Sequence, residues 1–258
     1  MVTVDLNIDG AVATLTVNRP HALNALNAEV LSALDQHVRT VDEDVSIRVA
    51  IVTGAGGKAF VAGADIKAMQ GMAPETARAF SALGHQVFAR MEASGTLFIA
   101  AVDGFCLGGG CELALACDWI NASGKSTFGQ PEVNLGLVPG FGGTIRLARK
   151  VGQARALQYC STAEYVRGEE AHRVGLVNSL FEAGEVLTKT QEQAQAIAAK
   201  GPLAVANCKR LIRAGLDLPQ ERGNAMEQQA FGLMFGTVDG QEGMTAFLEK
   251  RAAAFVGE

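Results

Sequence analysis

The chain has 258 residues, of which 48% are hydrophobic and 19% charged, so it can bury a full core as one large or two small domains. Its formal net charge of -5 at pH 7 and its scattered lysines and arginines exclude a basic surface of the kind that attracts nucleic acid. The composition is typical of a soluble globular protein.

Predicted strands and helices alternate in the first half of the chain. Asp9-Gly10 joins two alternating apolar runs as a hairpin, Asn27 caps the first helix, and Pro74 opens the second. Apolar spacing predicts strands at 2–8, 12–17, 49–52, 97–102 and from 119, and helices at 28–41, 74–91 and 109–117. These units predict a largely parallel sheet with helical crossovers.

The pattern becomes mostly helical after about residue 142. Helices are predicted at 143–149, 153–160, 185–200, 202–215 and 219–235, with one short strand at 176–181. The sequence contains no internal repeat, low-complexity tract or linker. We therefore expect the helical region to pack on the sheet core or on a neighbouring subunit.

The cysteines and the N-terminus indicate the compartment. The five cysteines form an odd set without a C-x-x-C pair: Cys106, Cys111, Cys117, Cys160 and Cys208. This pattern predicts buried thiols in a reducing compartment and no metal site. The first residues lack a signal-peptide pattern, and no stretch reaches membrane-spanning length. We therefore expect a cytoplasmic protein with no membrane partner.

Three glycine-rich stretches resemble nucleotide-binding loops but fail the required spacing. Residues 53–59 lack the gap between glycines and the hydroxyl residue after lysine, and 124–126 have Trp119 where the first glycine belongs. Residues 108–110 fail the G-x-G-x-x-G spacing, and Glu112 would repel a pyrophosphate. A nucleotide-phosphate site of these kinds is excluded.

The glycine run suits a ligand that develops negative charge. No side chain shields the Gly109 amide at the start of its predicted helix, where the macrodipole favours an anion. A second donor is the Ala64 amide, which Gly63 can turn away from the core. Two such amides form an oxyanion hole. The alternative is that both segments are ordinary turns between strand and helix.

Two carboxylates accompany these amides. Glu112 lies three residues after Gly109, on nearly the same helical face, among apolar neighbours that raise its pKa and favour acid–base chemistry. The alternatives are a pairing with an unseen arginine or a role as a helix-dipole partner. Glu132, after Pro131, is by itself typical of an exposed helix start, and only its pairing with Glu112 makes it a candidate.

These residues resemble the crotonase (enoyl-CoA hydratase/isomerase) superfamily, and within it the short-chain enoyl-CoA hydratases. The resemblance spans almost the whole chain. The matching motifs, in order, are NRP at 18–20, ALNAL at 22–26, KAF at 58–60, AGADI at 62–66, GFCLGGGCEL at 104–113, FGQPE at 128–132, PG at 139–140, GGT at 142–144, AHRVGLV at 171–177, EGM at 242–244 and FLEKR at 247–251.

The resemblance implies a hydratase mechanism. The amides of Ala64 and Gly109 polarise the thioester carbonyl of an acyl-CoA substrate and stabilise its enolate. Glu112 is the base that activates water, and Glu132 delivers a proton to the α-carbon, which gives syn hydration of a trans-2-enoyl-CoA to a 3-hydroxyacyl-CoA. No cofactor is implied, because coenzyme A is part of the substrate.

The resemblance also places the coenzyme A contacts. They are expected at His21, Ala22, Leu23, Ala62, Asp65, Ile66 and Lys67, with Phe247 and Lys250 reaching the coenzyme A of a neighbouring subunit. The alternative for Lys67 and Lys250 is that both are solvated surface charges.

Two departures from the family pattern stand out. Thr162-Ala163 replaces the Thr-Gly of many relatives, which affects only a local turn. Phe141 stands in a loop where relatives often have a small residue. A phenyl ring near the acyl site narrows the pocket, so we expect a preference for short chains such as crotonyl.

The presence of both Glu112 and Glu132 separates a hydratase from rival functions of the same fold. A Δ3-Δ2-enoyl-CoA isomerase needs one base and no water, whereas a non-catalytic member of the fold loses the acids, and this chain has both. An RNA-binding member needs a basic stripe that this sequence lacks.

For the fold, the resemblance implies an α/β spiral of repeated ββα units over 1–200 with the acyl-CoA site. It also implies a helical region over 201–258 that trimerises, as a homotrimer or as a hexamer of two stacked trimers. Met226, Phe231, Met234 and Phe235 form an apolar helix face that fits this role. The alternative is that this face packs within the chain.

Overall fold

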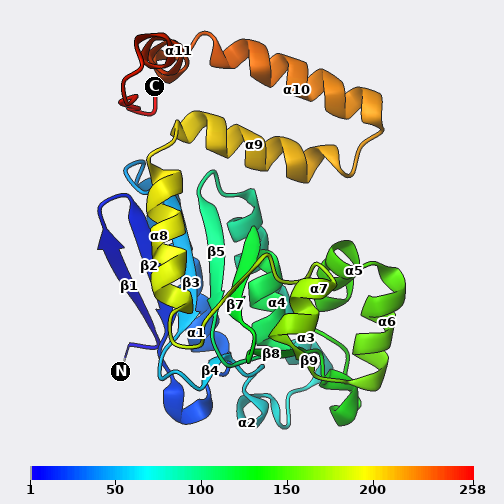
Figure 1. Ribbon diagram of the computed structural model, residues 1–258. Coiled ribbons are helices and arrows are strands. Elements are labelled where there is room, and N and C mark those ends of the chain that lie inside the picture. Colours follow the sequence, from blue (N-terminus) through cyan, green and yellow to red (C-terminus); the bar gives the residue numbers. More distant parts are fainter. Residues whose placement is uncertain (1) are drawn as a thin grey trace.

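The computed structural model describes residues 2–258 and contains two β-sheets, the helices around them, and a helical region at the C-terminus (Figure 1). The larger sheet has the strand order β1-β2-β3-β5-β7-β10. Its strands are β1 (Val4–Asp9), β2 (Val12–Val17), β3 (Val49–Gly54), β5 (Leu97–Val102), β7 (Trp119–Ser123) and β10 (Ser179–Phe181). In this sheet the β1–β2 hairpin is antiparallel and the other neighbouring strands pair in parallel.

The smaller sheet consists of short strands in the order β4-β6-β8-β9. Its strands are β4 (Ala59–Val61), β6 (Phe105–Leu107), β8 (Thr127–Gly129) and β9 (Val166–Arg167). The helices are η1 (Pro20–Ala22), α1 (Ala28–Glu43), α2 (Ile66–Met69), α3 (Pro74–Ala93), α4 (Gly109–Ala116), η2 (Glu132–Leu135), α5 (Gly143–Val151), α6 (Gln153–Thr162), α7 (Gly168–Arg173), α8 (Val186–Ala198), α9 (Pro202–Gly215), α10 (Gln220–Met234) and α11 (Val238–Glu249).

The expected spiral of ββα units is confirmed. A strand of the larger sheet is followed three times by a strand of the smaller sheet and then by helix: β3, β4 and α2–α3; β5, β6 and α4; β7, β8 and η2. Each repeat brings a turn after a short strand to the same edge of the smaller sheet, because β4, β6 and β8 pair in parallel. That edge carries the candidate site.

The hairpin, the predicted long strands and the predicted helices are confirmed with small shifts at their ends. The predicted largely parallel sheet is confirmed as the larger of the two sheets, whereas the short strands that form the second sheet were not predicted. Strands of two or three residues are too short to show a period of two. The strand predicted from 176 begins at Ser179, because Leu176 N and Val177 N donate back to Ala171 O.

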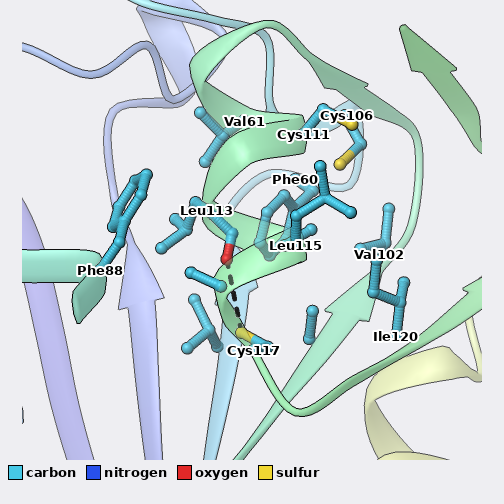
Figure 2. Close-up of a cluster of buried hydrophobic side chains, with 14 of the residues drawn as sticks. Phe60, Val61, Phe88, Val102, Cys106, Cys111, Leu113, Leu115, Cys117 and Ile120 are labelled. Carbon is cyan, nitrogen blue, oxygen red and sulfur yellow. Dashed lines mark hydrogen bonds between the residues drawn. The ribbon is translucent and has the colours of Figure 1, made fainter. Parts of the chain in front are cut away.

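Helix α4 is buried along its whole length against strands of both sheets and against α3 and α5. A side chain on Gly110 would overlap the Val61 carbonyl oxygen, so this glycine permits α4 to lie directly on β4. Figure 2 shows the apolar surroundings, and a dashed line marks the bond from Cys117 Sγ to Leu113 O, 3.6 Å long. The side chains labelled there are Phe60, Val61, Phe88, Val102, Cys106, Cys111, Leu113, Leu115, Cys117 and Ile120.

All five cysteines are free, but the prediction that all are buried was wrong. Cys106, Cys111 and Cys117 are buried around α4, whereas Cys160 is half-buried and Cys208 is exposed on α9. Cys208 is exposed because α9 contacts the sheets along one face only. No helix within residues 2–258 combines the length and apolar character needed to cross a membrane.

The C-terminal helices α9, α10 and α11 extend away from the two sheets (Figure 1). Of the predicted apolar face on α10, Met226 and Met234 are half-buried within the chain, but Phe231 and the neighbouring Phe235 are exposed. Phe231 is 67% exposed although its ring packs edge-on against that of Phe235, with centroids 5.1 Å apart. Packing within the chain therefore covers only part of this face.

Candidate active site

Glu112 lies in the first turn of α4 and is only 1% exposed. Its Oε1 accepts hydrogen bonds from the backbone amides of Phe141 and Gly143, each 2.7 Å long. Burial raises the pKa of this carboxyl group, while the two amides and the nearby Arg146 favour its charged form. The carboxylate is thus desolvated but held in one orientation.

Glu132 is the first residue of η2 and is half-buried. Its carboxylate lies against Gly108, since a Cβ at that glycine would be 2.8 Å from Glu132 Oε1 and 3.7 Å from Gly63 Cα. Burial, together with the charge of Glu112, raises the pKa of Glu132 to about 7. A carboxyl group with this pKa exchanges protons near neutral pH.

Gln130 connects the surroundings of the two acids. It is buried, and its carboxamide, oriented to donate, lies 3.1 and 3.2 Å from the two oxygens of Glu132. A Cβ at Gly143 would lie 2.5 Å from the end of the Gln130 side chain and 2.9 Å from Glu112 Cγ. The lack of a side chain at Gly143 therefore lets Glu112 and Gln130 approach the same point.

The Ala64 amide points away from Leu26, with which Ala64 forms an isolated parallel bridge. Leu26 bonds to the residues on either side of Ala64, because Leu26 N donates to Gly63 O and Asp65 N donates to Leu26 O. In a parallel bridge of this kind, the middle residue directs its own amide to the opposite side. Gly63, with φ of +111°, makes the turn that the sequence predicts.

The Gly109 amide is at the N-terminus of α4, where helical amides have no partner within the helix. The preceding Gly108 has φ of +48° and donates its own amide to Gly129 O. Within residues 2–258, neither the Ala64 nor the Gly109 amide donates a hydrogen bond to the protein. Both amides are therefore available to a ligand beside Glu132.

Phe141 forms one wall behind the Gly109 amide. A Cβ at Gly109 would be 3.2 Å from its ring, and the ring packs edge-on against Phe80 and Phe88, with centroids 5.2 and 5.9 Å away. Gly84 in α3 leaves the space that the ring occupies. The ring is thus fixed in the core next to the predicted oxyanion hole.

The structure brings the two N-terminal segments predicted to bind coenzyme A together. Ala62 N donates to Leu23 O over 3.0 Å, which places 21–23 beside 62–67. Asp65 also has a structural use, because it accepts from Ala68 N at the start of α2 and pairs with Arg19 at 2.9 Å. Of the other predicted coenzyme A contacts in these segments, His21, Ile66 and Lys67 are exposed, whereas Ala22 is half-buried.

Phe247 and Lys250 lie elsewhere. Both are exposed at the C-terminal end of α11, and Figure 1 shows that α11 and α2 lie at opposite ends of the molecule. The folded chain therefore does not bring these two residues to 21–23 and 62–67 in the same molecule, and their predicted contact requires a second subunit.

The amides of Phe141 and Gly143 that hold Glu112, and the side chain of Gln130, were not predicted as functional. The signal for the amides was the glycine pair Gly142-Gly143, since Gly142 has φ of +102°. The chemical outcome is a carboxylate held for one task, a second with pKa near 7, and two free amides. This set can stabilise an enolate while moving protons to and from its carbon and a water molecule.

Known proteins are similar to this chain over nearly its whole length. The enoyl-CoA hydratase/isomerase family model matches residues 7–258. A crotonyl-CoA hydratase of Syntrophomonas wolfei is 48% identical over 246 residues, covering 95% of both chains. A short-chain-enoyl-CoA hydratase of Clostridium acetobutylicum is 46% identical over 248 residues, covering 96% of this chain and 95% of that one. The crystal structure of an enoyl-CoA hydratase from Bacillus anthracis has a TM-score of 0.96 at 35% identity, covering 99% of this chain and 100% of that one.

Proposed function

The chain belongs to the enoyl-CoA hydratase/isomerase family, and from that premise we propose that it catalyses the reversible syn addition of water to trans-2-enoyl-CoA thioesters. The product is a 3-hydroxyacyl-CoA. The observation that carries the proposal is the pairing of Glu112, held by two amides, with Glu132, whose pKa is raised to about 7. Water addition needs one base that takes a proton from water and one acid that gives a proton to the α-carbon.

In the proposed mechanism the amides of Ala64 and Gly109 bind the thioester oxygen, which gains negative charge as water attacks the β-carbon. Ionised Glu112 accepts a proton from that water. Protonated Glu132 donates a proton to the α-carbon from the same side, so the addition is syn. After the addition Glu112 holds the proton taken from water and Glu132 is ionised. Dehydration starts from this state with the two roles exchanged, and a further hydration requires the proton to pass from Glu112 to Glu132, for which the next bound water is a route.

The proposal is tested by adding crotonyl-CoA to the purified protein. Hydration removes the ultraviolet absorbance of the conjugated enoyl thioester and adds the mass of one water to the product. Glu112→Gln and Glu132→Gln are each expected to lower kcat by about 10²- to 10⁴-fold with little change in KM. Glu29→Gln, at an exposed glutamate of α1, is the matched control.

The isomerase alternative gives a different result. An isomerase leaves the mass of its substrate unchanged and creates the conjugated absorbance from a 3-enoyl-CoA. It also keeps activity without one of the two acids, because it needs only one base. Retention of the starting mass with every substrate contradicts hydration.

We also propose a preference for short acyl chains, supported by the position of Phe141 beside Gly109. The wild type is expected to hydrate crotonyl-CoA faster than decenoyl-CoA, and Phe141→Leu is expected to reduce that difference. Leucine is preferred to alanine because loss of a buried phenyl ring costs about 3–5 kcal/mol of stability. Equal rates of the wild type on both substrates contradict this proposal.

Residues 201–258 are proposed to assemble the chain into a trimer or a hexamer of two trimers. The support is the exposure of Phe231, Phe247 and Leu248, at 67%, 82% and 79%, on helices that extend from the core. Sedimentation of the intact protein tests the assembly, and a monomer contradicts it. The expected cytoplasmic location stays a prediction.

The coenzyme A contacts are proposed on the same basis, including a role for Lys250 across a subunit boundary. Lys250→Ala is expected to raise KM for crotonyl-CoA. It is expected to have no effect on a crotonyl thioester that lacks the nucleotide, since a phosphate is the group that lysine binds. An equal rise in KM for both substrates contradicts the assignment.

A further inference from the structure

Arg146 of α5 holds the loop that orients Glu112. Its Nη1 donates to Phe141 O over 2.7 Å, while the amide of the same Phe141 donates to Glu112 Oε1 over 2.7 Å. A Cβ at Gly142 would overlap Arg146 Nη1, so the guanidinium group lies directly over this peptide. Phe141 is therefore held by hydrogen bonds at both its backbone amide and its carbonyl oxygen.

Arg146 is itself fixed by Glu92, near the C-terminal end of α3. Its Nε and Nη2 donate to the two carboxylate oxygens of Glu92 over 2.9 and 2.6 Å. The Arg146 side chain is only 13% exposed, and its guanidinium carbon lies 5.9 Å from the centre of the Phe88 ring. A planar guanidinium group matches this two-point contact, whereas an ammonium group does not.

The C-terminal region completes this anchor. Arg213 of α9 donates to Glu92 Oε1 over 3.1 Å and to Asp118 Oδ1 over 2.9 Å through Nη2. Asp118 also pairs with Lys209 of α9 at 3.0 Å, where the two side chains are 9% and 2% exposed. Charges of alternating sign thus run without a break from α9 to the loop at 140–143.

These five groups have no part in the proposed chemistry, yet they are buried or half-buried at a cost in desolvation. Lys209, Arg213 and Arg146 carry three positive charges, and Asp118 and Glu92 carry two negative charges. Ionised Glu112, which is joined to Arg146 by hydrogen bonds through the Phe141 peptide, is a third negative charge. Lys150 of α5 adds a fourth positive charge, since its Nζ lies 3.4 Å from Asp118 O, so positive charge exceeds negative charge even when Glu112 is ionised, and this favours the ionised base.

We propose that Arg146 is a positioning residue for Glu112, and that Glu92 and Arg213 hold Arg146 in place. The inference rests on the proposed hydration reaction. It makes helix α9 of the C-terminal region necessary for the orientation of the catalytic base. Arg146 acts through the loop and does not touch the substrate.

The test compares Arg146→Gln and Arg146→Lys with Arg149→Gln in the crotonyl-CoA assay. Arg149 lies on the same helix and pairs with exposed Asp217, so its substitution is expected to leave the kinetics unchanged. Arg146→Gln is expected to lower kcat by about 10- to 100-fold, the loss typical of a displaced catalytic group, while KM stays close to that of the wild type.

The pH dependence separates positioning from charge. The charge of Arg146 lowers the pKa of Glu112, so Arg146→Gln moves the acidic limb of kcat/KM to higher pH. Arg146→Lys keeps the charge but loses the two-point contact, so it lowers kcat without moving that limb. The other titratable groups near Glu112 and its loop are Glu132 of η2, Cys160 of α6 and His85 of α3, which these substitutions leave in place.

A double-substitution cycle shows whether the effect passes through Glu112. In the Glu112→Gln background, Arg146→Gln is expected to cause no further loss of kcat, because the group that it positions is gone. Arg213→Gln is expected to lower kcat in the same way but less, and Arg210→Gln, at an exposed residue of α9, is its control.

An equal loss of kcat in both backgrounds, or a change confined to KM, overturns the proposal. If Arg146→Gln does not fold, Arg146→Lys and Arg213→Gln decide the question by the same two criteria. A wild type that does not hydrate crotonyl-CoA refutes the proposed function before any of these variants is made, so the two failures are distinguishable.

Discussion

Substitution of Glu132 by glutamine is expected to lower kcat for hydration by about 10²- to 10⁴-fold and to stabilise the fold above neutral pH. The folded state holds the Glu132 proton up to a pKa of about 7, whereas an ordinary glutamate loses it near 4.5. Between these two values the folded state binds more protons than the unfolded state, so stability falls as pH rises. Glutamine has no such titration, and its advantage over glutamate grows over the same range.

The full pKa shift corresponds to about 3 kcal/mol at 1.36 kcal/mol per pH unit. Because Glu132 is half-buried, solvent screening reduces the expected gain to about 1–2 kcal/mol. For a chain of this length the gain raises Tm by roughly 2–8 °C.

The assay is thermal unfolding of the wild type and Glu132→Gln at one protein concentration, at pH 5 and pH 8. Groups other than Glu132 titrate in both proteins, so they largely cancel in the difference in Tm. The difference is expected to be small at pH 5 and to reach its full size at pH 8. An equal difference at both pH values, or a variant that is less stable at pH 8, refutes the reasoning about Glu132.

Three further predictions concern pH and glycine. The kcat/KM for hydration is expected to fall above about pH 7 as Glu132 ionises, and this fall is expected to be absent from the residual activity of Glu132→Gln; a wild-type profile that stays level to about pH 9 contradicts the role of Glu132. Gly110→Ala is expected to prevent folding in expression trials, whereas Gly232→Ala, in open space on α10, is expected to be tolerated. Ala163→Gly is expected to raise Tm, because Ala163 has φ of +54° and a left-handed residue with a Cβ costs about 1 kcal/mol; a lower Tm contradicts this.

Local patterns were sufficient to predict most of the fold. The predicted helix at 202–215 agrees with α9 at both ends, because Pro202 opens it and apolar residues recur at helical spacing. Short β4, β6 and β8 were missed, because each has only three residues and is defined by its neighbours in the second sheet. The burial of Cys208 was predicted wrongly, because α9 turns Lys209 and not Cys208 toward the core.

The candidate site was predictable where function follows from local geometry. Gly109 and Glu112 share one turn of a glycine-led helix, so their relation can be read from spacing alone. The amides of Phe141 and Gly143 lie 29 and 31 residues from Glu112, and Glu92 lies 54 residues from Arg146. Such contacts depend on how the repeats stack, and no local pattern encodes them.

Hydration of crotonyl-CoA in deuterated water tests the central claim most directly. Glu112 and Glu132 are proposed to act on one face of the substrate, so the deuterium added to the α-carbon and the hydroxyl group added to the β-carbon must enter from the same side. Proton coupling constants of the product distinguish the two geometries. The account predicts the syn product alone, and an anti product, or a mixture formed during the enzymatic step, contradicts it.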